Sequence, residues 1–420
     1  MSVSLIEDPQ LIMPVYNNIV FTVNSTNKAN CSFKYVCDVY VNGVYVTRLK
    51  LFPKGANGYA EFKVNRVLED FVTYDLQKNL TGFRTNDNSI LAYVLKFGEE
   101  YSTGCDGVTT IFPDLTVTSA FYAWNAALQY REWKDFDYTD FQMDGTSKRF
   151  LTNAPSGHLI KYSDSSVLNM FNLTSSVIDF AEVKTYDSSD NLLGTYTINN
   201  TFTTVSTTAR RLLSLGCGPD NLNKTTLASG SQPVITTSVA YYTVQLWNDT
   251  SPDVAVSELY AFEIDTRDTR FETKRFWWLN RLGAFDSYSF TLRDTRKVAI
   301  SKSKYSKLLG GLSGSEWTYT LGDRGQTVLN VIAQESGTVL SNWLSEDEAL
   351  WMEELFTSPE VYITEVNGDG CDVGGTGVTL NIDPIVITSS TFEEKVKKTT
   401  KNINYTIEYD KAYEKNVQRN

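Results

Sequence analysis

The chain has 420 residues, of which 41% are hydrophobic and 13% aromatic, and its formal net charge is −12. This length allows two or three domains with separate cores, and the apolar content excludes a wholly disordered chain. Because an acidic surface repels phosphate backbones, we expect no nucleic-acid partner.

The first element in chain order is a hairpin over residues 37–49. Asn42-Gly43 separates two alternating runs rich in Val and Tyr, and this dipeptide favours the type I′ turn of a two-residue hairpin. Residues 64–71 predict a short helical turn, residues 91–97 a strand, and residues 121–125 an aromatic strand that ends on Asn.

The same order of elements recurs further along the chain. Residues 181–198 predict a second hairpin, residues 208–213 a second helical turn, and residues 241–247 and 257–264 a strand pair. An aromatic strand that ends on Asn follows at residues 276–280.

The spacing between equivalent residues drifts from 145 (Arg66 to Arg211) through 149 (Tyr93 to Tyr242) to 155 (Asn125 to Asn280). Loop insertions produce such a drift. The repeat therefore predicts two related β domains in tandem, residues 1–150 and 151–290.

The last third, residues 291–420, has a different pattern. Residues 327–338 predict a strand or hairpin, and further strands are expected at residues 360–366, 378–388 and 404–409. Between them, Ser345 and Glu348 form a capping box that starts a helix over residues 346–356, with Ala349, Leu350, Leu355 and Phe356 as its apolar positions.

The fold class is therefore mainly β. We expect tandem antiparallel β-sandwich-like domains with few short helices, followed by a C-terminal β domain with one helix.

The termini and cysteines indicate the compartment. Residues 1–17 lack the basic and apolar regions of a signal peptide, and no run approaches the roughly 20 apolar residues that span a bilayer. We expect a chain made in the cytoplasm with no membrane partner. No CxxC pair occurs, so we expect buried free thiols rather than a zinc site or a disulfide framework; the cysteines are Cys31, Cys37, Cys105, Cys217 and Cys371.

Catalytic signatures are scarce. The sole histidine, His158, lies in a segment that reads as a loop, and neither GxSxG nor HExxH accompanies it. A Ser-His-Asp triad and a histidine metal site are therefore not expected. The glycine-rich segment 367–377 carries Asp369 and Asp372, which suit Ca²⁺, but it lacks the EF-hand order. We expect no cofactor and no enzymatic activity.

A carboxylate pair keeps one enzymatic alternative open. On a strand, Asp135 and Asp137 point to one face together with Trp133, as in a glycoside hydrolase cleft. An ordinary exposed strand has the same appearance. With 50 acidic residues in the chain, such pairs also arise by chance.

Several segments together resemble a family of virion proteins from tailed phages of gut Bacteroidetes, the crAss-like group included. They are residues 39–49 with 64–68, residues 276–288, residues 343–362, and residues 392–395 with 404–409. The resemblance implies a structural role in the tail, hub or fibre-attachment apparatus. It implies a location in the virion, other virion proteins as partners, and no catalytic residues.

One segment has the composition of an interface, and the family role implies a homo-oligomer. Interface cores favour Trp and Arg, so Arg275, Trp277, Trp278 and Arg281 are the candidate interface residues. The competing interpretation is a core strand, because an apolar strand is more often covered within its own domain. A carbohydrate-binding adhesin remains open as a further function.

Overall fold

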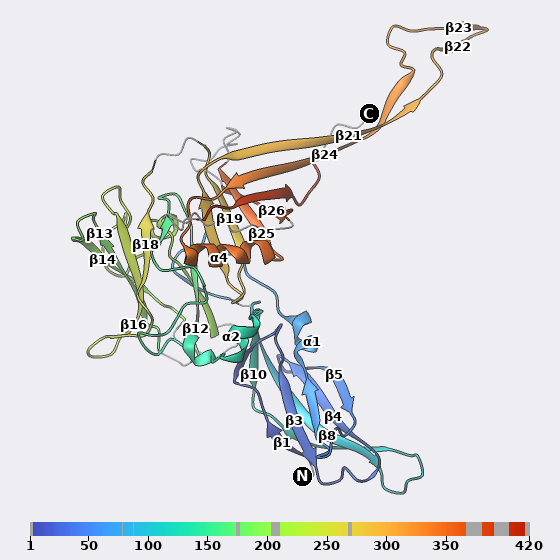
Figure 1. Cartoon of the computed structure of the whole chain (residues 1–420), viewed down its shortest axis with the longest axis vertical. Coiled ribbons are helices and arrows are strands. Elements are labelled where there is room, and N and C mark those ends of the chain that lie inside the picture. Colours follow the sequence, from blue (N-terminus) through green and yellow to red (C-terminus); the bar gives the residue numbers. More distant parts are fainter. Residues whose placement is uncertain are drawn as a thin grey trace. The chain divides into compact units, whose positions relative to one another are not determined.

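The computed structural model describes residues 3–77, 79–86, 88–173, 177–202, 211–267, 271–366, 380–389 and 403–415. The chain is mainly β, with several sheets and few short helices (Figure 1). It divides into two compact units. Unit 1 comprises Met1–Thr266 and Leu279–Asp286, and unit 2 comprises Arg267–Trp278 and Ser287–Asn420.

Two sheets form the first sandwich of unit 1. The larger has the order β2 (Ile12–Pro14), β10 (Phe121–Trp124), β8 (Ile90–Ser102), β4 (Cys31–Val41) and β5 (Val44–Leu51), with β9 (Thr110–Val117) paired to β8. The smaller has the order β1 (Val3–Glu7), β3 (Val20–Ser25) and β6 (Ala60–Lys63). Their inner faces meet in one buried aromatic cluster: Phe21 packs on Tyr93 and Phe62 on Phe97, with ring centroids 6.3 and 5.6 Å apart.

The second sandwich repeats this plan. Its larger sheet has the order β11 (His158–Ile160), β18 (Tyr260–Ile264), β16 (Tyr241–Asn248), β13 (Phe180–Tyr186) and β14 (Leu192–Asn199), with β17 (Val254–Ala255) paired to β16. Its smaller sheet has the order β12 (Val167–Phe171), β15 (Leu212–Gly216) and β7 (Phe83–Thr85). One apolar cluster fills the space between the two sheets.

Strand for strand, the two larger sheets have the same order and directions. In each, a hairpin lies at the edge, and the opposite edge strand runs parallel to its neighbour. The short helices match as well, because α1 (Asn65–Leu68) follows β6 as α3 (Pro219–Leu222) follows β15. The two sandwiches thus share one order in their larger sheets, and the duplication inferred from the sequence repeat stays a prediction.

Part of the residue alignment in that prediction is wrong. Tyr93 and Tyr242 do occupy equivalent places, since each is opposite a phenylalanine of the next strand, Phe121 and Phe262. The equivalent of β10 is therefore β18, whereas residues 276–278 belong to a strand of unit 2. The equivalent of α1 is α3, and residues 208–210 lie outside the described residues.

One strand of the second sandwich comes from the first half of the chain. β7 comes from the first half of the chain but pairs with β15 of the second sandwich. Directly after β7, the Asn86 side-chain amide donates to Asn169 Oδ1 over 2.9 Å, and both residues are buried. The expected boundary at residue 150 falls between β10 and β11, and both sandwiches lie in unit 1.

Unit 2 is built on a seven-stranded sheet. Its order is β20 (Phe285–Phe290), β19 (Lys274–Leu279), β25 (Val361–Val366), β26 (Leu380–Ile387), β27 (Thr406–Lys411), β24 (Gln326–Leu340) and β21 (Asp294–Ser306). The sheet thus begins before residue 291, the boundary expected from sequence.

The helix α4 (Glu346–Thr357) of unit 2 begins with the predicted capping box of Ser345 and Glu348. The stripe that it buries differs in part from the expectation. Trp351 and Met352 are buried, whereas Leu350 is 61% exposed. Trp351 packs on Trp278 of β19 with ring centroids 5.1 Å apart.

The cysteine expectation is wrong for one pair. Cys31 and Cys105 form a disulfide with a Cα–Cα distance of 5.2 Å. They are 74 residues apart in sequence, and the pairing of β4 with β8 sets Cys31 opposite Ser102, close to Cys105. Cys37 and Cys217 are free and buried, and Cys371 lies outside the described residues.

Candidate functional site

A long hairpin of unit 2 extends past its own sheet. β21 and β24 pair from Asp294 opposite Val339 to Ser306 opposite Gln326. Among the described residues, strand β27 pairs with β24 only at residues 336–340, and beyond them the Lys415 amide donates to the Ala333 carbonyl. We call residues 298–332 the arm. Among the described residues, no strand outside the hairpin pairs with it (Figure 1).

The arm exposes many large hydrophobic side chains. It holds 35 of the 420 residues, yet it carries 12 of the 30 exposed large hydrophobics among the described residues. Such a concentration of exposed apolar side chains is typical of an interaction surface. The twelve are Val298, Ile300, Tyr305, Leu308, Leu309, Leu312, Trp317, Tyr319, Leu321, Val328, Leu329 and Ile332.

The ribbon of the arm has two unlike faces. Directly opposed residues of an antiparallel pair lie on one face, and Lys302 is opposite Val331 as Lys304 is opposite Val328. Together with Val298 and Ile300, these residues form what we call the apolar-basic face. The opposite face carries mainly small and polar residues, namely Ala299, Ser301, Ser303, Asn330 and Gln334, with Tyr305 and Ile332.

The tip of the arm is folded by its own contacts. β22 (Gly311–Ser313) and β23 (Glu316–Thr318) form a small hairpin, and Trp317 Nε1 donates to the Leu309 carbonyl over 3.1 Å. Asp323 accepts from the backbone and hydroxyl of Thr320, and these hydrogen bonds lower the pKa of its carboxyl. The tip therefore presents its leucines on an ordered loop.

At the base of the arm, a charged pair joins the two strands. The Arg296 guanidinium donates to both carboxylate oxygens of Glu335, over 2.6 and 2.7 Å. These hydrogen bonds hold the pKa of Glu335 below its ordinary value. Such bidentate pairs fix geometry as well as charge, so the ribbon leaves the sheet from a defined base.

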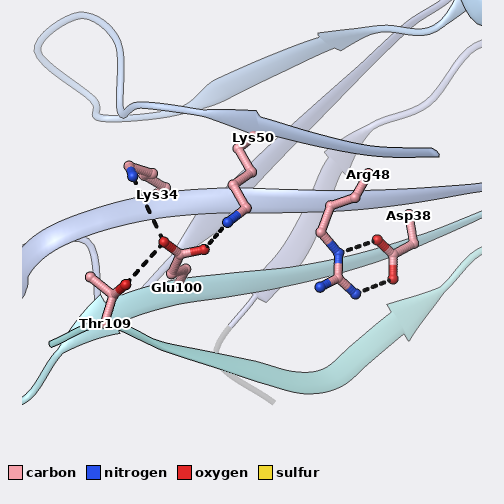
Figure 2. Close-up of polar contacts among 6 residues, drawn as sticks. All are labelled: Lys34, Asp38, Arg48, Lys50, Glu100 and Thr109. Atoms are coloured by element: carbon pink, nitrogen blue, oxygen red, sulfur yellow. Dashed lines mark hydrogen bonds and ion pairs between the residues drawn. The ribbon is translucent and has the colours of Figure 1, made fainter.

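A second polar feature lies on the first sandwich (Figure 2). Asp38 of β4 is directly opposite Arg48 of β5, and the guanidinium donates to both carboxylate oxygens over 2.6 and 2.7 Å. The Asp38 side chain is 5% exposed. This hydrogen bonding raises the pKa of Arg48.

Glu100 of β8 completes this charged face. Its carboxylate accepts from Lys50 Nζ and from Thr109 Oγ1, and Lys34 Nζ lies 3.7 Å away (Figure 2). The Lys50 hydrogen bond is the main cause that lowers the pKa of Glu100. A carboxylate held in its ionised form is a weak base and a poor proton donor. The network therefore suits cross-strand stabilisation rather than acid–base chemistry.

The four candidate interface residues lie in different environments. Arg275, Trp277 and Trp278 of β19 are buried within the chain. Arg275 donates to the Ser287 and Ser289 hydroxyls over 2.6 and 2.8 Å. Arg281, partly exposed, pairs with Glu132 at 3.3 Å. The β19 residues act as core here, so the case for an interface rests on the arm.

The residues considered for catalysis have a different local structure from the one expected. Residues 133–141 are not a strand, because α2 (Tyr130–Lys134) ends within them, residues 135–137 connect, and η2 (Tyr138–Phe141) follows. Asp137 instead caps η2 by accepting from the Thr139 amide over 2.9 Å. His158 is not in a loop but begins β11, where it is buried against Tyr260 and Phe262.

Neither metal clusters nor membrane-spanning helices are found where the structure is described. No group of three or more His, Cys, Asp or Glu side chains there is arranged to hold a metal ion. Likewise, no helix of that part is both long and apolar enough to cross a bilayer. The proposed Ca²⁺ segment, residues 367–377, lies outside the described residues.

No protein-family model matches the chain. No curated protein matches it either. Among solved structures, it is similar to dimeric latent PorU from Porphyromonas gingivalis, at 8% identity and a TM-score of 0.18. The match covers 80% of this chain and about a third (32%) of PorU. A similarity at this TM-score carries no argument about fold or function.

The sequence interpretation missed the arm. It predicted a strand or hairpin over residues 327–338 but did not recognise β21. The available signal was the β-branched pair Val298 and Ile300, two residues apart, followed by glycines at Gly310, Gly311 and Gly314. The first strand of such a ribbon is hard to recognise, because its lysines and serines resemble a loop.

Proposed function

We propose that the chain is a non-enzymatic structural component of a bacteriophage virion, located in the tail and assembled with copies of itself and with other virion proteins. The observation that carries the assembly role is the arm, which exposes twelve large hydrophobic side chains on an ordered ribbon. The placement in a phage tail rests on the family resemblance of the sequence segments.

Unit 1 is compatible with a scaffold. Its two sandwiches are closely packed, and the charged groups in Figure 2 are paired with one another. Tandem β domains present broad faces and strand edges, which suit ring or fibre-attachment assemblies.

The decisive experiment is mass spectrometry of purified particles of the encoding phage. The proposal expects this chain in the particle in a fixed ratio to the major structural proteins, still present after a high-salt wash. Absence from washed particles would contradict it.

A carbohydrate-binding adhesin is the second candidate, because Trp317 and Tyr319 at the arm tip are exposed and flat aromatic side chains suit sugar rings. A glycan array separates the two functions. Binding that is lost in the double variant Trp317→Ala and Tyr319→Ala would favour the adhesin. No binding would favour the purely structural role.

A further inference from the structure

The arm is an incomplete structure as it stands in one chain. A two-stranded hairpin is at best marginally stable in water. The arm also has two strand edges that no other described strand covers. Unpaired edges and exposed apolar side chains both favour docking against another surface.

The backbone of the arm argues for a protein surface rather than a lipid bilayer. Hydrocarbon offers no hydrogen-bond partners, so open sheet edges do not occur within it. The exposed apolar residues also occur along the ribbon, at Val298, Ile300 and Val328, as well as at the tip. A protein surface satisfies both the edges and the side chains.

The charge of the arm indicates which protein. Four basic residues and two acidic ones give the arm a net charge of +2. Because the whole chain has a net charge of −12, the remainder carries −14. On the apolar-basic face, Lys302 and Lys304 lie beside Ile300 and Val328. This face fits a surface that combines carboxylates with apolar groups, and a second copy of this chain supplies the acidic excess.

We propose that the arm docks on an acidic surface of the body of a second copy of this chain, mainly through its apolar-basic face. The inference deepens the proposed function and rests on it. A standard interface takes about 20–30 residues from each partner, and the arm holds 35. Because the arm and its acceptor are different surfaces, the contact is heterologous, and repetition closes a ring or extends a fibre.

The test begins with light scattering of the full chain over a range of concentrations. The wild type is expected to form oligomers. The variant Ile300→Ser with Val328→Ser, and separately the charge reversal Lys302→Glu with Lys304→Glu, are each expected to weaken association at least tenfold. The matched control is Ser301→Ala with Ser303→Ala on the opposite face, which is expected to associate like the wild type.

A capture experiment then tests the direction of docking. Replacing residues 300–333 by Asn-Gly joins the directly paired Ala299 and Gln334 with a two-residue hairpin turn. This shortened chain keeps only residues 298–299 of the arm, together with the acceptor surface. When it is immobilised, this variant is expected to capture wild-type chains through their arms but not other copies of itself. Capture of neither, or of both equally, would overturn docking of arm on body.

The remaining outcomes each decide the inference. A wild type that is monomeric at every concentration, or oligomers that all arm variants leave unchanged, would overturn it. Binding to vesicles of anionic phospholipid that is lost in the arm variants, with a monomeric wild type, would assign the arm to membranes instead. Failure of the proposed function is distinct, because the chain would then be absent from phage particles while still associating through the arm.

Discussion

At the level of single residues, the Cys31–Cys105 disulfide is the strongest local constraint on the first sandwich. It closes a loop with a sequence separation of 74 residues, and a loop of that length loses much conformational freedom in the unfolded chain when it is cross-linked. The end of the sandwich where β4 and β8 meet is therefore held covalently as well as by the strand ladder.

We expect the double variant Cys31→Ala with Cys105→Ala to lower the free energy of unfolding of unit 1 by about 2–4 kcal/mol. Urea denaturation with and without reductant measures this change. Reductant is expected to destabilise the wild type by a similar amount and to leave the double variant unaffected, because Cys37 and Cys217 are free thiols already. Equal stability of oxidised and reduced wild type would count against the constraint.

At the level of elements, the charged face joins β4, β5 and β8 across their strands, with Thr109 just before β9, and Glu100 is its centre. Its pKa is lowered in the folded protein. Ionised Glu100 therefore stabilises the fold above its unfolded pKa of about 4.3. That stabilisation is lost as the pH falls through the lower, folded pKa.

Glu100→Gln is expected to cost about 1 kcal/mol at pH 7, a modest value because Lys34 and Lys50 are partly exposed to solvent. The difference from the wild type should shrink towards zero in acid, once Glu100 is protonated in both states. Urea denaturation at several pH values measures it. The control is Glu61→Gln, which changes an exposed carboxylate paired with Lys54. A difference for Glu100→Gln that does not vary with pH would contradict the stabilising role of ionised Glu100.

Elements with a local signal could be predicted from sequence. The turn at Asn42-Gly43 has positive φ at both residues, 49° and 82°, as the hairpin requires, and α4 starts at its capping box. Elements that depend on distant partners could not. Residues 133–138 are a separate case: they looked like a strand, although the local capping box of Gln129 and Glu132 favours the helical turn α2.

The functional surface was harder to predict for the same physical reason. Trp277 and Trp278 have interface composition, but whether a strand is buried depends on what covers it. Trp278 packs on Trp351 of α4, and this helix lies about 70 residues further along the chain. Conversely, β21 has the lysines and serines of a loop, and only its pairing with β24 identifies it as a strand. Composition alone does not distinguish a covered face from a free one.

At the level of the whole molecule, the chain combines two sandwiches whose larger sheets have the same strand order with a separate seven-stranded sheet. Each larger sheet places a buried tyrosine, Tyr93 or Tyr242, at the same point of the same strand order. Because β7 comes from the first half of the chain and pairs with β15 of the second sandwich, the two sandwiches depend on each other for stability. Since unit 2 has its own sheet, and α4 packs on it, unit 1 and unit 2 are expected to unfold as separate cooperative blocks.

Calorimetry tests this division. We expect two transitions, one for each unit. Trp278→Ala removes a fully buried indole that packs on Trp351, so it should cost about 3–5 kcal/mol and lower only the unit 2 transition, by roughly 10 °C. The variant without Cys31 and Cys105 should lower only the unit 1 transition. A single transition that both variants shift together would mean that the whole chain unfolds as one block, with the two sandwiches and the seven-stranded sheet sharing their stability.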